Sequence, residues 1–283
     1  MSEPFRRGTV QCASARRMAY VEWGDPHART LVCAHGLTRC ARDFDFLAPE
    51  MARRGYRVIC PDVAGRGDSD WLKDPMDYAV PTYAKDMLML LARMELESVH
   101  WVGTSLGGLV GMALAAIPGS PIERLVLNDV GPVLTVAALQ RIAAYVGKWP
   151  PLPTIEAAEQ FVRATSATFG PHNDAEWRFL TEHVVRRNAD GTLRMHYDPA
   201  IAVPFNAELP SQDIELWSFY DAIRCPTLAV RGEQSDLLTR DTVAQMAERG
   251  PRARVVEIAG VGHAPTLIHA DQLAIVRDFL LGA

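Results

Sequence analysis

The sequence predicts an α/β protein built around a doubly wound, mostly parallel sheet. Short apolar segments alternate with amphipathic segments along most of the chain, and the alternation resumes after a helical interruption. Several apolar runs, such as Leu125-Val126-Leu127, show no polar alternation. Such runs are typical of strands that are buried on both faces of a parallel sheet. Repeated strand–helix alternation then favours right-handed crossovers, with helices covering the sheet.

The expected strands and helices follow from apolar runs and from capping signals. The strands are Arg17–Trp23, Thr30–Ala34, Tyr56–Cys60, Val99–Val102, Arg124–Asn128, Pro226–Arg231 and Arg254–Ile258. Gly55 is a natural C-cap for a helix over Asp43–Arg54, and Thr82 is a plausible cap for Thr82–Met94. A helix rich in Gly and Ala is expected over Ser105–Ile117, and a last helix over Asp271–Leu280.

The segment between Gly131 and Leu216 departs from this alternation. Helical signals follow one another there without a strong strand between them. They cover Ala137–Val146, Ala158–Phe169 and a segment that Asp174 could cap, and a short extended piece is expected over Thr192–His196. We therefore predict a helical lid over residues 131–216, inserted into one core domain of residues 1–130 and 217–283.

Composition narrows the class of protein. The chain has 283 residues, 48% of them hydrophobic and 22% charged, which is enough to bury a full core. Its formal net charge of -5 argues against a nucleic-acid binder. Apolar runs fall short of the ~18 residues of a membrane span, and residues 1–8 lack the apolar core of a secretory signal. The five cysteines form no CxxC pair. We expect reduced thiols, no metal site and a cytoplasmic protein.

The sharpest local motif is Gly103-Thr104-Ser105-Leu106-Gly107. It follows a predicted strand and opens a predicted helix, which is the context of a nucleophile elbow. Glycines on both sides allow the strand and the helix to approach closely, and the helix N-terminus offers free N–H groups. We therefore expect Ser105 to be a nucleophile. The alternative is an incidental serine in a glycine-rich turn.

A serine nucleophile needs a base, and the base needs an orienting carboxylate. His263 follows the last predicted strand in a glycine-containing loop and is the expected base. Asp236 lies in the loop beyond the strand Pro226–Arg231 and is the expected acid. Asp129 and Glu233 remain the alternatives for this carboxylate.

An acyl-transfer site also needs two donors for an oxyanion. We expect the backbone N–H groups of Leu106 and Leu37 to supply them, the latter from the loop His35-Gly36-Leu37-Thr38. His35 is expected to tie this loop by hydrogen bonds. Arg39 is expected to be a solvated surface residue, and contact with a substrate carboxylate is the alternative.

Taken together, these motifs resemble the α/β-hydrolase superfamily over nearly the whole chain. They are His35-Gly36, the stretch Pro61–Asp70, the serine elbow, Asp236 and Gly262-His263. The resemblance implies the α/β-hydrolase fold with a lid before the acid-bearing strand, and a structural turn over Pro61–Asp70. Haloalkane dehalogenases and most epoxide hydrolases of this fold have Asp at the elbow, so Ser105 argues against both. What remains resembles carboxylesterases, lactonases and cofactor-free perhydrolases.

The leading hypothesis is therefore a carboxylesterase-like serine hydrolase. Ser105, His263 and Asp236 would cleave small to medium, fairly hydrophobic esters through an acyl-enzyme, with no metal or organic cofactor. A lactonase or a carbon–carbon bond hydrolase with the same triad is the alternative, and a ligand receptor with slow turnover is a third hypothesis. We expect a small-molecule substrate and no nucleic-acid or membrane partner.

Overall fold

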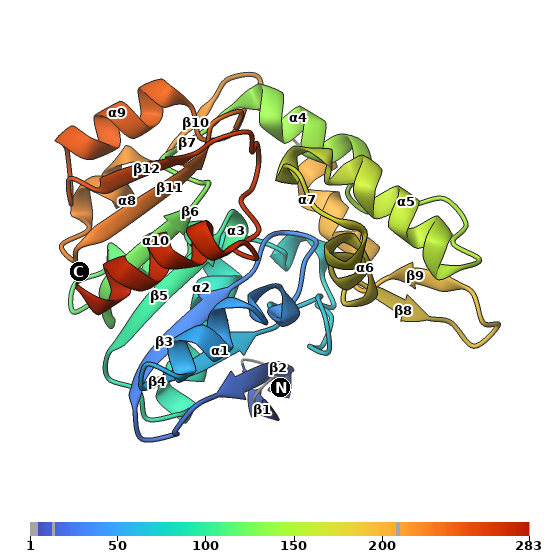
Figure 1. Cartoon of the computed structure of the whole chain (residues 1–283), viewed down its shortest axis with the longest axis horizontal. Helices are drawn as coiled ribbons and strands as arrows, with labels where there is room; N and C mark the ends of the chain where they lie inside the picture. Colours follow the sequence, from blue (N-terminus) through green and yellow to red (C-terminus); the bar gives the residue numbers. More distant parts are fainter. Residues whose placement is uncertain (1–4, 13–14, 208–209, 283) are drawn as a thin grey trace.

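A computed structural model describes residues 5–12, 15–207 and 210–282. An eight-stranded sheet runs through it in the order β1-β2-β4-β3-β5-β6-β11-β12 (Figure 1). Its strands are β1 Arg6–Gln11, β2 Arg17–Trp23, β3 Arg29–Ala34, β4 Tyr56–Pro61, β5 Val99–Thr104, β6 Ile122–Asn128, β11 Thr227–Gly232 and β12 Arg254–Ile258. Pairing is antiparallel for β1 with β2 and for β2 with β4, and parallel for the rest. All seven expected strands and the mostly parallel sheet are confirmed.

The edge strand β1 was missing from the sequence prediction. Its sequence is polar and its side chains are largely exposed. A strand that buries so little of its surface lacks the continuous apolar signal that marks the central strands. Residues 1–4, on which part of the expectation for the N-terminal segment rests, lie outside the described residues.

Helices cover both faces of the sheet, as the doubly wound class requires (Figure 1). Side chains of β3 alternate between two buried clusters, with Leu31 facing one and Val32 the other. The helices α1 (Leu47–Ala52) and α10 (Ala270–Leu281) contribute to the first cluster. The second cluster includes side chains from α2 (Val80–Arg93), α3 (Leu106–Ala115), α8 (Trp217–Ala222) and α9 (Arg240–Glu248). The sequence prediction did not include α8 and α9.

The segment between β6 and β11 lies outside the main sheet, on the right of Figure 1. It contains α4 (Val136–Tyr145), α5 (Ile155–Thr165), α6 (Asp174–Glu182), α7 (Ala202–Ala207) and the hairpin of β8 (Val185–Arg187) with β9 (Leu193–Met195). The short strands β7 (Val133–Leu134) and β10 (Ile214–Glu215) pair near its two ends. Asn173, not Asp174, caps α6, because its side chain accepts from the N–H of Glu176 while Glu176 bonds back to the Asn173 N–H.

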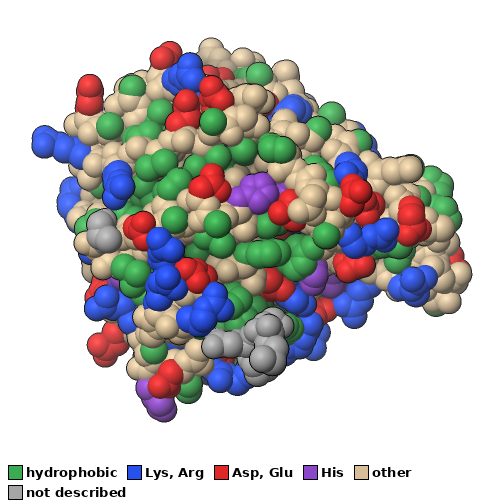
Figure 2. Space-filling view, in the orientation of Figure 1, with side chains coloured by type: hydrophobic (Ala, Val, Ile, Leu, Met, Phe, Trp, Pro, Cys, Tyr) green, Lys and Arg blue, Asp and Glu red, His purple; other side chains and the backbone are tan. Residues whose placement is uncertain are grey.

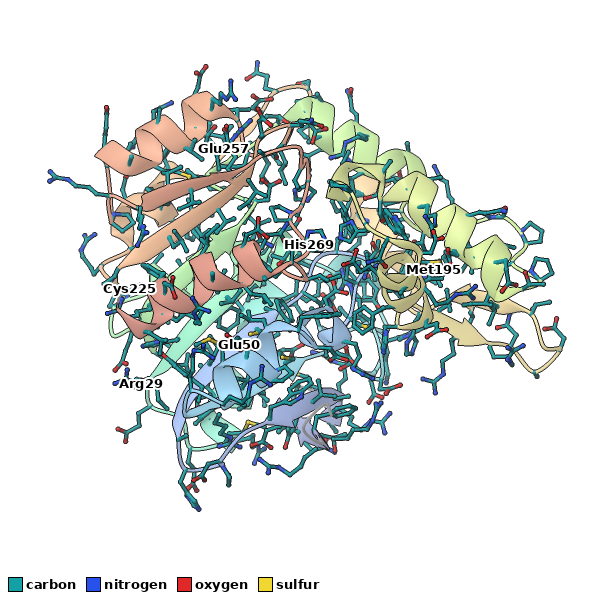
Figure 3. The ribbon with its side chains drawn as sticks, in the orientation of Figure 1. Arg29, Glu50, Met195, Cys225, Glu257 and His269 are labelled. Atoms are coloured by element: carbon teal, nitrogen blue, oxygen red, sulfur yellow. The ribbon has the colours of Figure 1, made fainter. Side chains whose placement is uncertain are left out.

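Contacts tie this segment to the loop that precedes α10. His172 Nε2 lies 2.9 Å from Thr266 Oγ1, and His269 Nε2 lies 3.4 Å from Glu176 Oε1. Figure 3 shows His269 beside the helical segment. On the face seen in Figure 2, basic and acidic side chains are interspersed rather than gathered by sign. Within the described residues, no helix is long and apolar enough to cross a membrane.

Candidate active site

Ser105 occupies a tight turn between β5 and α3. Its φ of 51° is a backbone conformation that residues with side chains rarely adopt. The turn depends on its glycines. A Cβ built on Gly107 would lie 2.0 Å from the carbonyl oxygen of Ala34, and one on Gly103 would lie 2.3 Å from that of Gly107. Backbone atoms cannot yield at such distances, so the predicted elbow needs these residues.

A chain of hydrogen bonds links Ser105, His263 and Asp129. His263 Nε2 lies 2.9 Å from Ser105 Oγ, and His263 Nδ1 lies 2.8 Å from Asp129 Oδ2. The histidine comes from the loop between β12 and α10, and Thr168 Oγ1 holds this loop by donating to the His263 carbonyl at 2.5 Å. Ser105 and His263 therefore meet as the sequence predicted.

The carboxylate on His263 belongs to Asp129, at the end of β6. The Asp129 side chain is fully buried. Besides the contact with His263, it accepts hydrogen bonds from the Gly232 N–H and from Ser235 Oγ, each at 2.7 Å. Several donors thus fix the orientation of this buried carboxylate.

The expected contact between Asp236 and His263 is wrong. Asp236 instead binds Arg141 of α4, with Oδ2 at 2.6 Å from Nε and Oδ1 at 2.7 Å from Nη2. In the turn after β11 the hydroxyl of Ser235 bonds to Asp129, while the next residue is half-exposed and its carboxylate pairs with Arg141. Burial opposes the ionisation of Asp236, but the hydrogen bonds and charge of Arg141 outweigh it and lower the pKa of Asp236. The other alternative, Glu233, accepts from the Gly260 N–H at 2.9 Å.

Hydrogen bonds from buried side chains hold the loop after β3 in place. His35 Nδ1 donates to the Gly36 carbonyl at 2.7 Å, and His35 Nε2 accepts from the Val63 N–H at 3.0 Å. This confirms the expected tie, and burial lowers the pKa of His35 to about 4. The fully buried Arg66 donates from Nε to the Leu37 carbonyl at 2.8 Å. Leu106 is the first residue of α3, where backbone N–H groups have no partner within the helix.

The stretch Pro61–Asp70 supplies much of this support and has the structural role that the resemblance implied. The Asp62 carboxylate accepts from the N–H groups of Ala41 at 2.7 Å and Asp68 at 2.9 Å. Ser69 Oγ accepts from the Ala19 N–H and donates to the Asp62 carbonyl. These contacts join the turn to β2 and to the segment before α1, so Arg66 projects from a fixed base.

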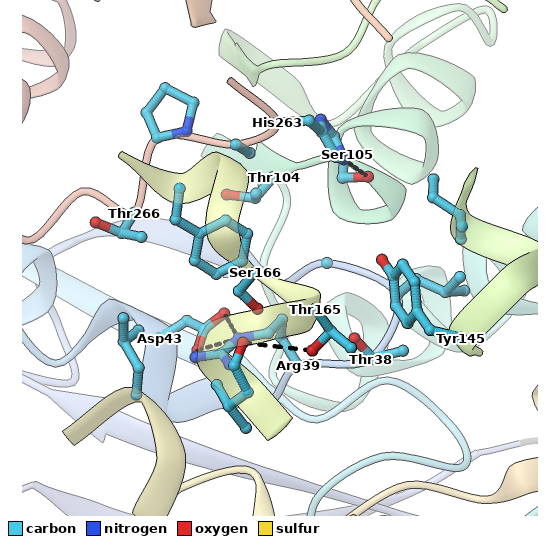
Figure 4. A pocket seen from close by; sticks show the side chains of 18 of the residues that line it. Thr38, Arg39, Asp43, Thr104, Ser105, Tyr145, Thr165, Ser166, His263 and Thr266 are labelled. Carbon is cyan, nitrogen blue, oxygen red and sulfur yellow. Dashed lines mark hydrogen bonds and ion pairs between the residues drawn. The ribbon is translucent and has the colours of Figure 1, made fainter. Parts of the chain in front are cut away.

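A cavity opens beside Ser105 on the His263 side, and its lining mixes charged, hydroxyl-bearing and apolar side chains (Figure 4). Arg39 lines it and is only 8% exposed, so the expectation of a solvated surface arginine is wrong. Its guanidinium is held by Asp43, with Nε at 3.0 Å and Nη2 at 2.7 Å from carboxylate oxygens. Other polar side chains that line this cavity were not predicted from the sequence, among them Arg141, Tyr145 and Ser166. Arg141 is the one charged residue of α4, which is the signal that could have pointed to it.

A second cavity meets Ser105 from the other side and is largely apolar. It is lined by aliphatic and aromatic side chains from α2, α3, α4 and α7, including Val80, Leu109, Leu139 and Phe205. Leu37, Ser105 and Ile142 line both cavities. Among the described residues, no group of His, Cys, Asp and Glu side chains is arranged to hold a metal ion.

Comparisons with known proteins agree with this fold. The family described as alpha/beta hydrolase fold matches residues 29–270. The chain belongs to this family and is a hydrolase.

Individual relatives resemble the chain over its full length. The chain is 48% identical to a 3-hydroxybutyrate-oligomer hydrolase of Cupriavidus necator, over 100% of each chain. An esterase of Mycobacterium tuberculosis is 26% identical and covers 96% of this chain and 89% of its own. The crystal structure of an alpha/beta hydrolase from Novosphingobium aromaticivorans superposes with a TM-score of 0.89 at 36% identity, over 100% of each chain.

Proposed function

We propose that this hydrolase is a serine esterase in which Ser105, His263 and Asp129 form the catalytic triad. The observation that carries the proposal is the continuous chain of hydrogen bonds from Ser105 through His263 to the buried Asp129. Nucleophile, base and orienting carboxylate in this geometry are what acyl transfer to serine requires.

The proposed mechanism needs only the ester, water and these side chains. Ser105 Oγ attacks the ester carbonyl carbon while His263 Nε2 takes the hydroxyl proton. Asp129 holds the proton on His263 Nδ1 and stabilises the imidazolium. The N–H groups of Leu37 and Leu106 stabilise the oxyanion. The carbon–oxygen bond then breaks, and His263 gives its proton to the leaving alcohol. Water attacks the acyl-enzyme with His263 again as base, which releases the acid and restores Ser105.

We further propose that the substrates are short oligoesters of 3-hydroxybutyrate or of a similar hydroxyacid. The full-length likeness to the 3-hydroxybutyrate-oligomer hydrolase supports this choice. The apolar cavity suits the small to medium, fairly hydrophobic ester that the sequence analysis favoured. Residues 131–216 would act as the lid, because α4 and α5 contribute side chains to the cavity wall opposite Ser105.

The test combines covalent labelling with turnover. A fluorophosphonate probe should label Ser105 in the wild type and leave Ser105→Ala unlabelled, as read by intact mass and peptide mapping. The wild type should hydrolyse p-nitrophenyl butyrate and the 3-hydroxybutyrate dimer, with the acids identified by chromatography. A folded wild type that is not labelled, or Ser105→Ala with wild-type rates, would contradict the triad. If the wild type hydrolyses lactones, or cleaves a carbon–carbon bond of diketones, but hydrolyses neither ester, the alternative reaction replaces the esterase proposal.

A further inference from the structure

We propose that the cavity on the His263 side of Ser105 binds the free carboxylate of the leaving hydroxyacid through the Arg39 guanidinium, with Arg141 beside it. The enzyme would then cut the ester bond next to the carboxyl end of an oligomer. This inference rests on the proposed function and deepens it, because it states which end of the substrate lies in which cavity.

The first step is the position of His263. Two cavities meet at Ser105, and His263 lines only one of them. The general acid must be within hydrogen-bond reach of the leaving oxygen. The alcohol part of the ester therefore lies in the cavity that His263 lines, and the acyl part lies in the apolar one.

The second step is the chemistry of the two linings. The His263 side carries Arg39 together with the hydroxyl groups of Thr38, Tyr145 and Ser166 (Figure 4). Arg141 and apolar side chains also line it, so what distinguishes this cavity is its two arginines. The other side is mainly aliphatic and aromatic. In a linear ester of 3-hydroxybutyrate, the alcohol part at one end carries a free carboxylate. A carboxylate is matched by the arginine-bearing cavity, since the apolar cavity could not compensate its lost hydration.

The ion pair with Asp43 uses only some of the donors of Arg39. Asp43 holds Nε and Nη2, and none of the hydrogen bonds within the described residues uses Nη1. The ion pair thus fixes the orientation of the guanidinium, and the Nη1 donor stays available for a ligand. Arg39 as a whole is largely buried, but Nη1 is not among the fully enclosed side-chain atoms of the described residues, so this donor is open to the cavity. Binding a carboxylate there costs little side-chain entropy, because the ion pair with Asp43 already orders the arginine.

Arg39 lies near the nucleophile. A Cβ built on Gly36 would lie 3.7 Å from Arg39 Cγ and 3.9 Å from Ser105 Cβ. The nucleophile and the arginine therefore flank the same glycine. In a 3-hydroxyacid, two carbon atoms separate the ester oxygen from the carboxylate carbon, so the proposal requires a carboxylate site in the same cavity as Ser105, which Arg39 lines. Arg141 and Tyr145 line the same cavity as Arg39.

The test compares the 3-hydroxybutyrate dimer as the free acid with its methyl ester, because the two differ in the charge at one end. Wild type should favour the free acid in kcat/KM by about 10- to 100-fold, as expected for a hydrogen bond to a charged group. Arg39→Gln should abolish this preference, mainly by raising KM for the free acid. Arg39→Lys should restore part of it.

Asp43→Asn is the matched control, because it breaks the same ion pair and leaves the guanidinium in place. A purely structural Arg39 predicts that Arg39→Gln and Asp43→Asn damage hydrolysis of both dimers alike. The inference predicts that Asp43→Asn keeps the preference for the free acid. Arg141→Gln removes a partly exposed arginine and should lower the preference less than Arg39→Gln does.

A second measurement separates this inference from the proposed function. Free 3-hydroxybutyrate should inhibit hydrolysis of p-nitrophenyl butyrate more strongly than methyl 3-hydroxybutyrate does, and Arg39→Gln should remove the difference. If the wild type cleaves no dimer but shows this inhibition, the proposed substrate fails and the carboxylate site stands. Equal inhibition by acid and methyl ester, or equal kcat/KM for the two dimers, overturns the inference. If no ester is cleaved, calorimetric titration of the wild type with the same two compounds decides in the same way.

Discussion

At the scale of single residues, Asp129 and Asp236 show what sequence order can and cannot determine. Both follow a strand and lie near the edge of the sheet where Ser105 and His263 meet, so both were candidates for the acid. What separates them is the direction of each side chain within its turn. Asp129 is enclosed by donors, whereas Asp236 turns to Arg141. Spacing identified Ser105 and His263, because the elbow and the glycine loop are local features. It could not give the direction of a side chain in a loop.

This assignment predicts a large difference between two conservative variants. Asp129→Asn should lower kcat by about 10⁴-fold, because the amide would favour the wrong tautomer of His263. Asp236→Asn should lower kcat by less than about 10-fold, since it weakens only the partly exposed pair with Arg141. Steady-state hydrolysis of p-nitrophenyl butyrate, with circular dichroism as a check of folding, compares the two. If Asp236→Asn is the more damaging variant, Asp129 is not the acid.

At the scale of elements, the strand–turn–helix unit around Ser105 was predictable because its requirements are local. β5 is a continuous apolar strand, and α3 packs so closely on β5 and on the neighbouring β3 that only glycine fits at Gly103 and Gly107. The edge strand β1 and the helices α8 and α9 were not predictable in this way, since their order comes from packing on the rest of the molecule. Arg39 was misjudged for the same reason, because its burial depends on α5 and on the loop after it.

The elbow gives a second prediction. Gly107→Ala should destabilise the fold by several kcal/mol, about the cost of a severe overpacking change, because the added methyl would meet the Ala34 backbone. Gly119→Ala is a useful control. Unlike Gly107, Gly119 has a positive φ, but a Cβ there meets no atom within 4 Å. Its cost should be limited to backbone strain of about 1 kcal/mol. Urea unfolding followed by fluorescence measures both. A Gly107→Ala protein as stable as Gly119→Ala would argue against the close packing of α3 on β3.

At the scale of the whole molecule, the described residues place the site between the sheet and the segment 131–216. The sequence indicated this insertion by its change of pattern, but not which of its side chains line the cavities. That depends on how α4, α5 and α7 pack over the sheet. Burial of polar groups beneath the site also shapes the response of the fold to pH, because His35 and His100 are both enclosed in the core.

Stability should therefore decrease on acidification. Burial lowers the pKa of His35 and of His100 to about 4, from an ordinary value of 6.5. Below pH 6.5 both histidines become protonated in the unfolded chain, whereas in the folded protein they stay neutral until about pH 4. The free energy of unfolding therefore falls over this range. Asp62 acts in the opposite direction between its ordinary value of 3.8 and about pH 6, where burial has raised its pKa. The pKa values of His172 and His196 are lowered as well, and that of Asp86 is raised, so four histidines against two carboxyls leave a net loss.

Urea unfolding at several pH values between 7 and 4.5 measures this slope. His100→Asn should flatten it by the share of one proton, and the exposed His27 offers a control substitution, His27→Asn, that should leave it unchanged. A wild type whose unfolding free energy is constant from pH 7 to 4.5 would contradict the burial of these neutral imidazoles.

The meeting of two unlike cavities at Ser105 also bears on the order in which products appear. With the charged end of the chain anchored beside His263, each round of hydrolysis removes one terminal unit and creates a new carboxylate on the shortened chain. A trimer would yield one dimer and one monomer first, and a tetramer would pass through the trimer rather than split into two dimers. Monomer would therefore accumulate from the first turnover, whatever the length of the starting oligomer.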